Sequence, residues 1–242
     1  EEVWKKLREE YQIEAVYTNR DYEPYGRERD KKLYHSWKEN GPQFRGFKDQ
    51  VLLEKDEVLK GDGQPYVVFT PYMRKYKSLL TDQHFSAFPS KEALVNLYQQ
   101  DPLPMLSLED MGFEAFSFQY PDRVIDEEII RNYDKQRDIP SVKGTSRLSM
   151  HLRHGTVSVR EVARKGQEIN PKFFNEIIWR DFYQSILYHF PESLDHSFKP
   201  EYDSIQWENN QEHFEAWCAG KTGYPLVDAG MRELNETGWM HN

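Results

Sequence analysis

The apolar positions along the chain predict a change from mixed strands and helices to helices alone. Residues 1–11 have the spacing of a charged amphipathic helix, and residues 13–17 (IEAVY) and 50–53 (QVLL) are short apolar runs typical of buried strands. A polar, Arg-rich turn and helix lie between these runs, and GDGQP (61–65) predicts a turn. Strands that alternate with helices favour α/β layering with a parallel sheet.

From about residue 77 to residue 127 the periodicity fades, and Pro, Ser, Asp and Phe interrupt the chain. This predicts an inter-domain connection with short helices. Beyond Asp126 the strand patterns disappear, so the predicted fold class is α/β followed by all-α.

Local sequence marks where the later helices begin and end. Ser158 and Glu161 have the spacing of a capping box, which predicts a helix start. Asn170 followed by Pro171 predicts an N-cap and first turn, with a helix that runs to about His189. The pair at 224–225 (YP) predicts another helix, which ends at Gly238.

The helix that follows Pro171 has two distinct faces at 100° per residue. The apolar face consists of Phe174, Ile177, Ile178 and Phe182. The opposite face carries an acid, an indole, a guanidinium and a phenol, namely Glu176, Trp179, Arg180 and Tyr183. These groups suit recognition of a base and of a phosphate or carboxylate. The alternative is a second buried interface with an intrahelical Glu176–Arg180 pair.

The segment GTSRLS (144–149) gathers hydroxyls and backbone amides at a predicted helix start, beside Arg147. Such a donor set is typical of an anion site. The alternative is an ordinary helix start with a surface arginine. The helix is expected to end at Gly155, after Arg153 and His154.

Composition and charge restrict the classes of protein. The net charge is −9, yet residues 131–183 hold 11 basic and 6 acidic residues, so a polyanion would bind there. Hydrophobic residues make up 38% of the chain, no apolar run reaches the length of a membrane span, and there is one cysteine. We expect a soluble, cytoplasmic protein with no membrane association.

Two further residue pairs receive ordinary interpretations. His151 and His154 have no acidic or cysteine partner nearby in the sequence, so we expect no metal site. Trp207 and Trp217 are expected to be core residues because large aromatic side chains are usually well buried.

Taken together, four blocks of sequence resemble the DNA photolyase/cryptochrome family, and within it bacterial class I cyclobutane-pyrimidine-dimer photolyases. They are YDKQRD (133–138), GTSRLS (144–149), NEIIWRDFY (175–183) and GKTGYPLVDAGMRELNETGWMHN (220–242). NRDYEPYGRERD (19–30) and PYVVFTPYMRKY (65–76) resemble the antenna domain of the family.

The resemblance implies the later part of a Rossmann-like antenna domain (1–76), a long connector (77–126) and the first half of a helical FAD-binding domain (127–242). We therefore expect an internal fragment of a protein that is monomeric at full length. Because the matching block continues in the family beyond residue 242, we expect the fragment to be inactive alone.

The resemblance also implies roles for individual residues. The flavin site would include Tyr133, Thr145, Ser146, Arg147, Leu148, Ser149 and Trp239. Ultraviolet-damaged DNA would contact Arg137, Glu176, Trp179, Arg180, Tyr183 and Asn242. Glu176 would stabilise charge on the dimer, and Trp207 would be the outermost tryptophan of a photoreduction chain.

The implied reaction is light-driven electron transfer that splits a cyclobutane pyrimidine dimer. The alternatives are a cryptochrome-like blue-light photoreceptor and an acidic helical interaction module without a cofactor. Folate-using relatives have an Asn-Glu pair where this chain has Tyr25 and Gly26. A second antenna chromophore, folate or a deazaflavin, is therefore left open.

Overall fold

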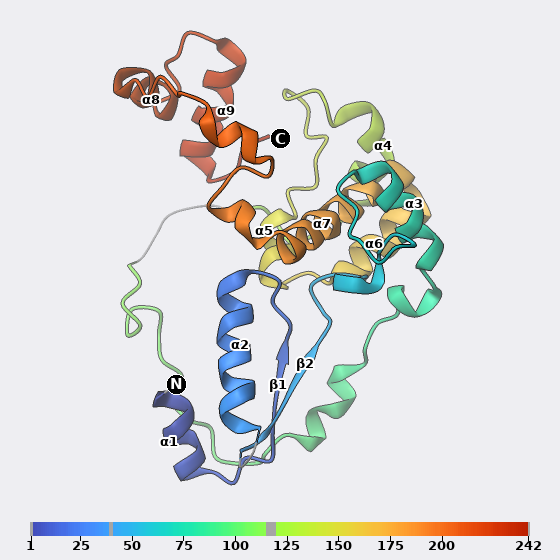
Figure 1. Cartoon of the computed structure of the whole chain (residues 1–242), viewed down its shortest axis with the longest axis vertical. Helices are drawn as coiled ribbons and strands as arrows, with labels where there is room; N and C mark the ends of the chain where they lie inside the picture. The colour runs from blue at the N-terminus through green and yellow to red at the C-terminus, as the bar shows by residue number, and fades with distance from the viewer. Residues whose placement is uncertain (1, 39–40, 115–119, 242) are drawn as a thin grey trace. The chain divides into compact units, whose positions relative to one another are not determined.

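The computed structural model describes residues 2–38, 41–114 and 120–241, coloured in Figure 1 from blue at the N-terminus to red at the C-terminus. The chain divides into two compact units. The first comprises Glu1–Ser86 and Ile125–Gln206, and the second comprises Ala87–Val124 and Trp207–Asn242. No helix among the described residues has the length and apolar character needed to cross a bilayer.

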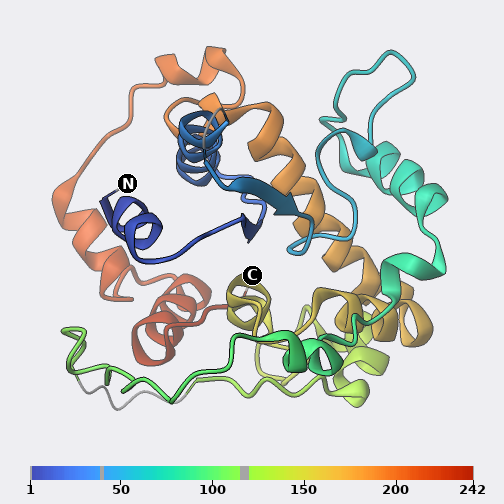
Figure 2. The same cartoon turned by 90° about the horizontal axis from the view of Figure 1, so that it is seen from below.

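The first unit begins with a small α/β layer. Its elements are α1 (Glu2–Glu10), β1 (Ala15–Asn19), α2 (Pro24–Trp37) and β2 (Gln43–Phe47). The strands are parallel, with Ala15 opposite Gln43 and Asn19 opposite Phe47. Helix α2 lies alongside the strands (Figures 1 and 2), and the Trp37 ring packs between Trp4 and Phe44, with centroids 5.2 and 6.0 Å away.

The predicted strand at 50–53 is wrong, because β2 lies at 43–47 instead. Val51, Leu52 and Leu53 are buried as expected, but they form an irregular segment against α7. The backbone amide of Leu52 bonds to the carboxylate of Asp181, 2.9 Å away, and not to a neighbouring strand. A short apolar run therefore indicated burial correctly at 51–53, but it did not indicate a strand.

Helix α3 (Phe69–Leu79) follows the turn predicted at 61–65, where Leu59 and Pro65 form an antiparallel bridge. Gly63, with φ 80°, adopts the left-handed conformation that the turn requires. Short helices were expected in the connection at 77–126, and two 3-10 turns lie there, η2 (Asp82–Phe85) and η3 (Ser90–Asn96). A further 3-10 turn, η1 (Lys55–Glu57), precedes α3.

Four helices complete the first unit, with the 3-10 turns η4 (Pro191–Leu194) and η5 (Pro200–Ser204) after them. The helices are α4 (Glu127–Gln136), α5 (Ser149–His154), α6 (Val159–Ile169) and α7 (Pro171–His189). The start of α7 is confirmed, since the Asn170 side chain accepts a hydrogen bond from the Lys172 amide at 3.0 Å. The end of α5 is confirmed by Gly155, with φ 67°. Ser158 precedes α6, but its side chain makes no capping bond, so the predicted capping box is wrong.

The main core of the first unit lies where α7 meets α3, α4 and α6. It is built from the apolar face of α7, from Val162 and Ala163 of α6, from Ile130 of α4, and from Tyr72 and Tyr76 of α3. The loop after β2 contributes Leu52, Leu53 and Val58 to this core. The loop after β2 and the helices therefore share one core, and α7 is its central element.

The second unit contains α8 (Gln211–Cys218) and α9 (Pro225–Thr237). The buried carboxylate of Asp228 accepts hydrogen bonds from the Thr222 amide at 2.7 Å, the Thr222 hydroxyl at 2.6 Å and the Gly223 amide at 3.0 Å. These bonds lower the pKa of Asp228. Gly238, with φ 66°, ends α9 as predicted.

Candidate functional site

The two faces of α7 have different surroundings, as the sequence predicts. Phe174, Ile177, Ile178 and Phe182 are all buried in the main core. On the other face, Tyr183 is 63% exposed, whereas Glu176, Trp179 and Arg180 are partly buried and contact other segments of the same unit.

Glu176 forms a polar cluster with two residues of the α4 region. Nη1 of Arg137 lies 2.6 Å from Oε1 of Glu176. The Arg137 guanidinium lies over the Tyr133 ring, 5.5 Å from its centroid, and that ring packs edge-on against Phe173 at 5.2 Å. Burial raises the pKa of Glu176, and the contacts with Arg137 and Tyr133 oppose that rise. The structure thus joins three predicted site residues in one cluster.

The indole of Trp179 lies in an aromatic cluster. The Phe69 ring, at the first position of α3, stacks on it with centroids 3.6 Å apart and planes inclined by 6°. Tyr183 lies 5.5 Å away at 23°, and buried Phe182 contacts the indole edge-on at 5.7 Å. Phe69 was not predicted, because no periodicity relates it to α7.

Arg180 binds backbone carbonyl groups. Its Nη1 donates to the carbonyl oxygen of Gln50, and its Nη2 lies 3.4 Å from that of Leu152. The intrahelical Glu176–Arg180 pair is therefore not formed, since Glu176 pairs with Arg137 and Arg180 with these carbonyls. Arg180 connects α7 to the loop after β2 and to α5.

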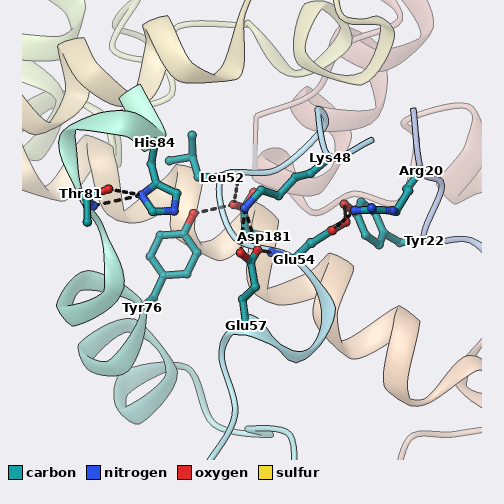
Figure 3. Close-up of polar contacts among 10 residues, drawn as sticks. All are labelled: Arg20, Tyr22, Lys48, Leu52, Glu54, Glu57, Tyr76, Thr81, His84 and Asp181. Carbon is teal, nitrogen blue, oxygen red and sulfur yellow. Dashed lines mark hydrogen bonds and ion pairs between the residues drawn. The ribbon is translucent and has the colours of Figure 1, made fainter. Parts of the chain in front are cut away.

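Asp181, which the sequence analysis did not single out, is the most buried charged group of α7. Its Oδ2 accepts hydrogen bonds from the Leu52 amide at 2.9 Å and the Tyr76 hydroxyl at 2.6 Å (Figure 3). Burial raises its pKa to about 6, although these bonds and Arg180 act in the opposite direction. The position could have been found, because Asp181 follows Ile177 by four residues and so lies on the apolar face.

The segment 144–149 follows Tyr133 and Arg137 in the sequence and carries several hydrogen-bond donors. Among the described residues, the hydroxyls of Thr145, Ser146 and Ser149 make no hydrogen bond. Leu148 is buried, and Arg147 has φ 52°, an uncommon left-handed conformation for a non-glycine residue. Gly144 packs so closely that an added Cβ would lie 2.6 Å from the carbonyl oxygen of Gln136.

The basic surplus of residues 131–183 is partly neutralised within the first unit. Arg153 pairs with Glu23 at 2.8 Å, Arg160 with Asp49 at 2.9 Å, and Lys165 with Glu127 at 2.9 Å. Three exposed lysines make no ion pair with any residue that the structure describes, namely Lys135, Lys143 and Lys172. With Arg131, which is also exposed and forms no ion pair with a described residue, they are available to a polyanion.

Two predicted site residues lie in the second unit. Trp207 is 72% exposed and Trp217 is 44% exposed, so the expectation that they are core residues is wrong. Trp239 follows α9, where its amide bonds to the Thr237 hydroxyl at 3.2 Å. Asn242 lies outside the described residues.

A cavity of about 350 Å³ opens beside α2 and β2 in the first unit. Its wall includes aromatic side chains and six charged ones, of which four are cationic and two acidic: Arg20, Arg27, Lys31, Lys55, Asp21 and Asp30. Arg27 lies over the Tyr188 ring at 4.1 Å, and Arg20 pairs with Glu54, which also accepts a bond from Tyr22 (Figure 3). Nearby, Tyr25 is 81% exposed, and a Cβ on Gly26 would clash with Asp21.

Comparison with known proteins gives two family matches and several related proteins. Residues 1–92 match the model described as DNA photolyase, and residues 173–242 match the FAD binding domain of DNA photolyase. A deoxyribodipyrimidine photo-lyase of Synechococcus is 32% identical over 98% of this chain and 54% of its own length. The chain thus spans about half the length of the curated relatives it matches.

Solved structures agree with these matches. A bacterial class III photolyase from Agrobacterium tumefaciens superposes with a TM-score of 0.84 at 29% identity, covering 100% of this chain and 54% of that chain. An archaeal photolyase from Sulfolobus tokodaii, solved with two FAD molecules, gives 0.69 at 30% identity, covering 98% and 54%. The chain, a mostly helical protein with a small parallel sheet, belongs to the DNA photolyase/cryptochrome family.

Proposed function

We propose that this chain is the part of a deoxyribodipyrimidine photo-lyase that recognises ultraviolet-damaged DNA and holds the phosphates of FAD. The observation that carries the proposal is the arrangement on α7. The half-buried carboxylate of Glu176 and the stacked indole of Trp179 lie about one turn apart on the helix that the FAD-binding family model matches. Relatives named as photo-lyases, with 32% and 33% identity, support the activity.

In this proposal residues 1–76 are the later part of the Rossmann-like antenna domain, 77–126 the connector and 127–242 the start of the FAD-binding domain. The matches at 1–92 and 173–242 support this division. Trp207, with its exposed indole, would exchange electrons at the surface, and Trp239 would line the flavin pocket.

The donors at 144–149 fit the phosphates and sugar of FAD. Three hydroxyl groups that bond to no residue the structure describes, those of Thr145, Ser146 and Ser149, can each donate to an anionic or hydroxyl oxygen. Arg147 adds a cation, and its positive φ is the kind of backbone strain found at ligand-binding segments. Tyr133 and Leu148 complete the proposed flavin contacts. Bound FAD would supply light absorption and the electron that the dimer accepts and returns.

The residues of α7 would bind and orient the dimer. Trp179 offers a flat apolar surface to two unstacked pyrimidines, Tyr183 borders it, and Arg137 would contact the DNA from its pair with Glu176. Because burial raises the pKa of Glu176, its carboxyl group holds a proton more readily than an exposed one. A protonated Oε can donate a hydrogen bond to a pyrimidine carbonyl as negative charge develops there. Arg180 would support this surface through its bonds to the chain, and Asn242 would contact the DNA.

The cavity beside α2 is proposed to take a second chromophore. Four cationic side chains outnumber the two acidic ones, and with the aromatic walls they suit an anionic ring system. Since a side chain at position 26 would meet Asp21, the Asn-Glu pair of folate-using relatives has no counterpart there. Folate and a deazaflavin both remain candidates, and the Sulfolobus relative binds a second FAD.

The replacement Trp179→Ala tests the proposed function. We expect it to weaken binding of a dimer-containing oligonucleotide by about 1–3 kcal/mol, because one base-stacking surface is lost. Affinity is measured by fluorescence anisotropy, with the undamaged oligonucleotide as competitor. Trp4→Ala is the control, since Trp4 is also partly buried and contacts an aromatic ring, but lies on α1. Equal dimer affinity for both variants and the wild type would contradict the proposal.

A further inference from the structure

Phe69 covers one whole face of the Trp179 indole. The ring centroids are 3.6 Å apart and the planes are almost parallel, at 6°. At this separation no base can enter between the two rings, since stacked aromatic planes are already in contact. Any ligand that stacks on Trp179 must therefore approach the other face.

The two neighbours of the indole differ in how firmly they are held. Phe69 begins α3, where it also contacts buried Phe182 edge-on at 5.8 Å. Helix α3 is tied to α7 by the bond between the Tyr76 hydroxyl and Asp181, 2.6 Å long and fully buried. Tyr183, by contrast, is 63% exposed and lies off-centre at 5.5 Å. Phe69 is therefore held against the core, whereas Tyr183, which also stacks on the indole, is mostly exposed to solvent.

We infer that Phe69 is a positioning residue for dimer recognition, which holds the Trp179 indole in one plane and restricts stacking to a single face. This inference rests on the proposed function. A tryptophan side chain has two free torsions, and an exposed indole loses that freedom when a ligand binds. Stacking on Phe69 restricts the torsions beforehand, so a pyrimidine pair meets a surface that is already in place.

The first part of the test observes the stack without any ligand. The difference between wild-type emission and that of Trp179→Phe isolates the fluorescence of Trp179. We expect Phe69→Leu to raise acrylamide quenching of this component, because a leucine side chain cannot stack on the indole and hold it in one plane as the ring does. Phe85→Leu is the matched control: Phe85 is also partly buried but contacts Phe174 and not Trp179. Equal quenching in the two leucine variants would overturn the inference.

The second part measures affinity for a dimer-containing oligonucleotide. Phe69→Leu keeps the apolar volume and so the fold, and we expect it to weaken binding about two- to tenfold, as loss of one aromatic pair does. Phe69→Tyr, which restores a ring, should bind like the wild type. In the Trp179→Ala background Phe69→Leu should cause no further loss, because the indole that it positions is gone.

The outcomes separate this inference from the proposed function. If Trp179→Ala weakens dimer binding while Phe69→Leu does not, Phe69 is not a positioning residue, and the role of Trp179 stands. An additive effect of the two changes would also overturn the inference. If Trp179→Ala itself leaves dimer affinity unchanged, the proposed function fails, and the positioning role fails with it.

Discussion

At the scale of single residues, the polar side chains of α7 are held by segments far away in the sequence. Glu176 reaches Arg137 across 39 positions, and Asp181 reaches Leu52 across 129. The contacts of Glu176 and of Asp181 have different effects. The Arg137 bond opposes the rise that burial causes in the pKa of Glu176, whereas the contacts of Asp181 satisfy a carboxylate that water does not reach.

Asp181 predicts a dependence of stability on pH. Its pKa in the folded chain, about 6, lies above the ordinary value of 3.8, so the folded state binds the proton more tightly. The stabilising contribution is fully present below pH 3.8 and is lost as the pH rises through 6. Between these values we expect the free energy of unfolding to fall by at most about 3 kcal/mol.

The measurement compares urea unfolding of the wild type and of Asp181→Asn from pH 4 to pH 7. The asparagine variant cannot titrate, so this decrease should be absent from its profile. Asp101→Asn, a change at an exposed carboxyl, should leave the decrease in place. Parallel profiles for the wild type and Asp181→Asn would show that Asp181 does not titrate in this range.

At the scale of elements, Gly144 sets how closely the segment 144–149 approaches α4. A Cβ at this position would lie 2.6 Å from the backbone carbonyl oxygen of Gln136, which cannot move without the helix. We expect Gly144→Ala to cost about 1–3 kcal/mol of stability, as overpacking does. It should also weaken FAD binding, because the hydroxyls of Thr145 and Ser146 are displaced.

Chemical denaturation and a flavin fluorescence titration measure these two effects. Gly61→Ala is the matched control, since nothing lies within 4 Å of its added Cβ and its φ is not positive. It should leave FAD affinity unchanged and alter stability only slightly. If both alanine variants bind FAD equally well, the close approach of Gly144 has no part in the cofactor site.

The elements that local sequence could predict are those with their own start and end residues. Helix α7 was predicted from Asn170 and Pro171, and its buried face from a 3.6-residue period. The strand at 43–47 was missed because Arg45 and Gly46 weaken its pattern, while the buried loop at 50–53 imitated one. The contact of Phe69 with Trp179 depends on tertiary packing, so no local pattern could indicate it.

At the scale of the whole molecule, the net charge is negative, but one segment, residues 131–183, holds more basic than acidic residues. The chain carries −9, yet Lys135, Lys143 and Lys172 lie in the segment with a basic surplus and are not paired within the described part. We expect DNA affinity to fall as salt rises, with a slope set by the phosphates that such lysines contact. Lys143→Gln with Lys172→Gln should reduce that slope by about 1 per lysine that contacts a phosphate.

Salt titrations of binding to the dimer-containing oligonucleotide measure the slope. The control replaces two exposed lysines of α1, Lys5→Gln with Lys6→Gln, which changes the net charge equally. If the α1 variant lowers the slope as much as the other pair does, binding responds to total charge and not to residues 131–183.

The bonds of Asp181 also bear on how the chain folds during synthesis. Leu52 and Tyr76 precede Asp181 by 129 and 105 residues, so their polar groups lack this buried partner until α7 has left the ribosome. Closing loops of this length is slow, because the entropy is lost before the contacts form. The loop after β2 and helix α3 would therefore stay accessible to chaperones and proteases until α7 has left the ribosome, and completion of this core would be governed by a single late helix.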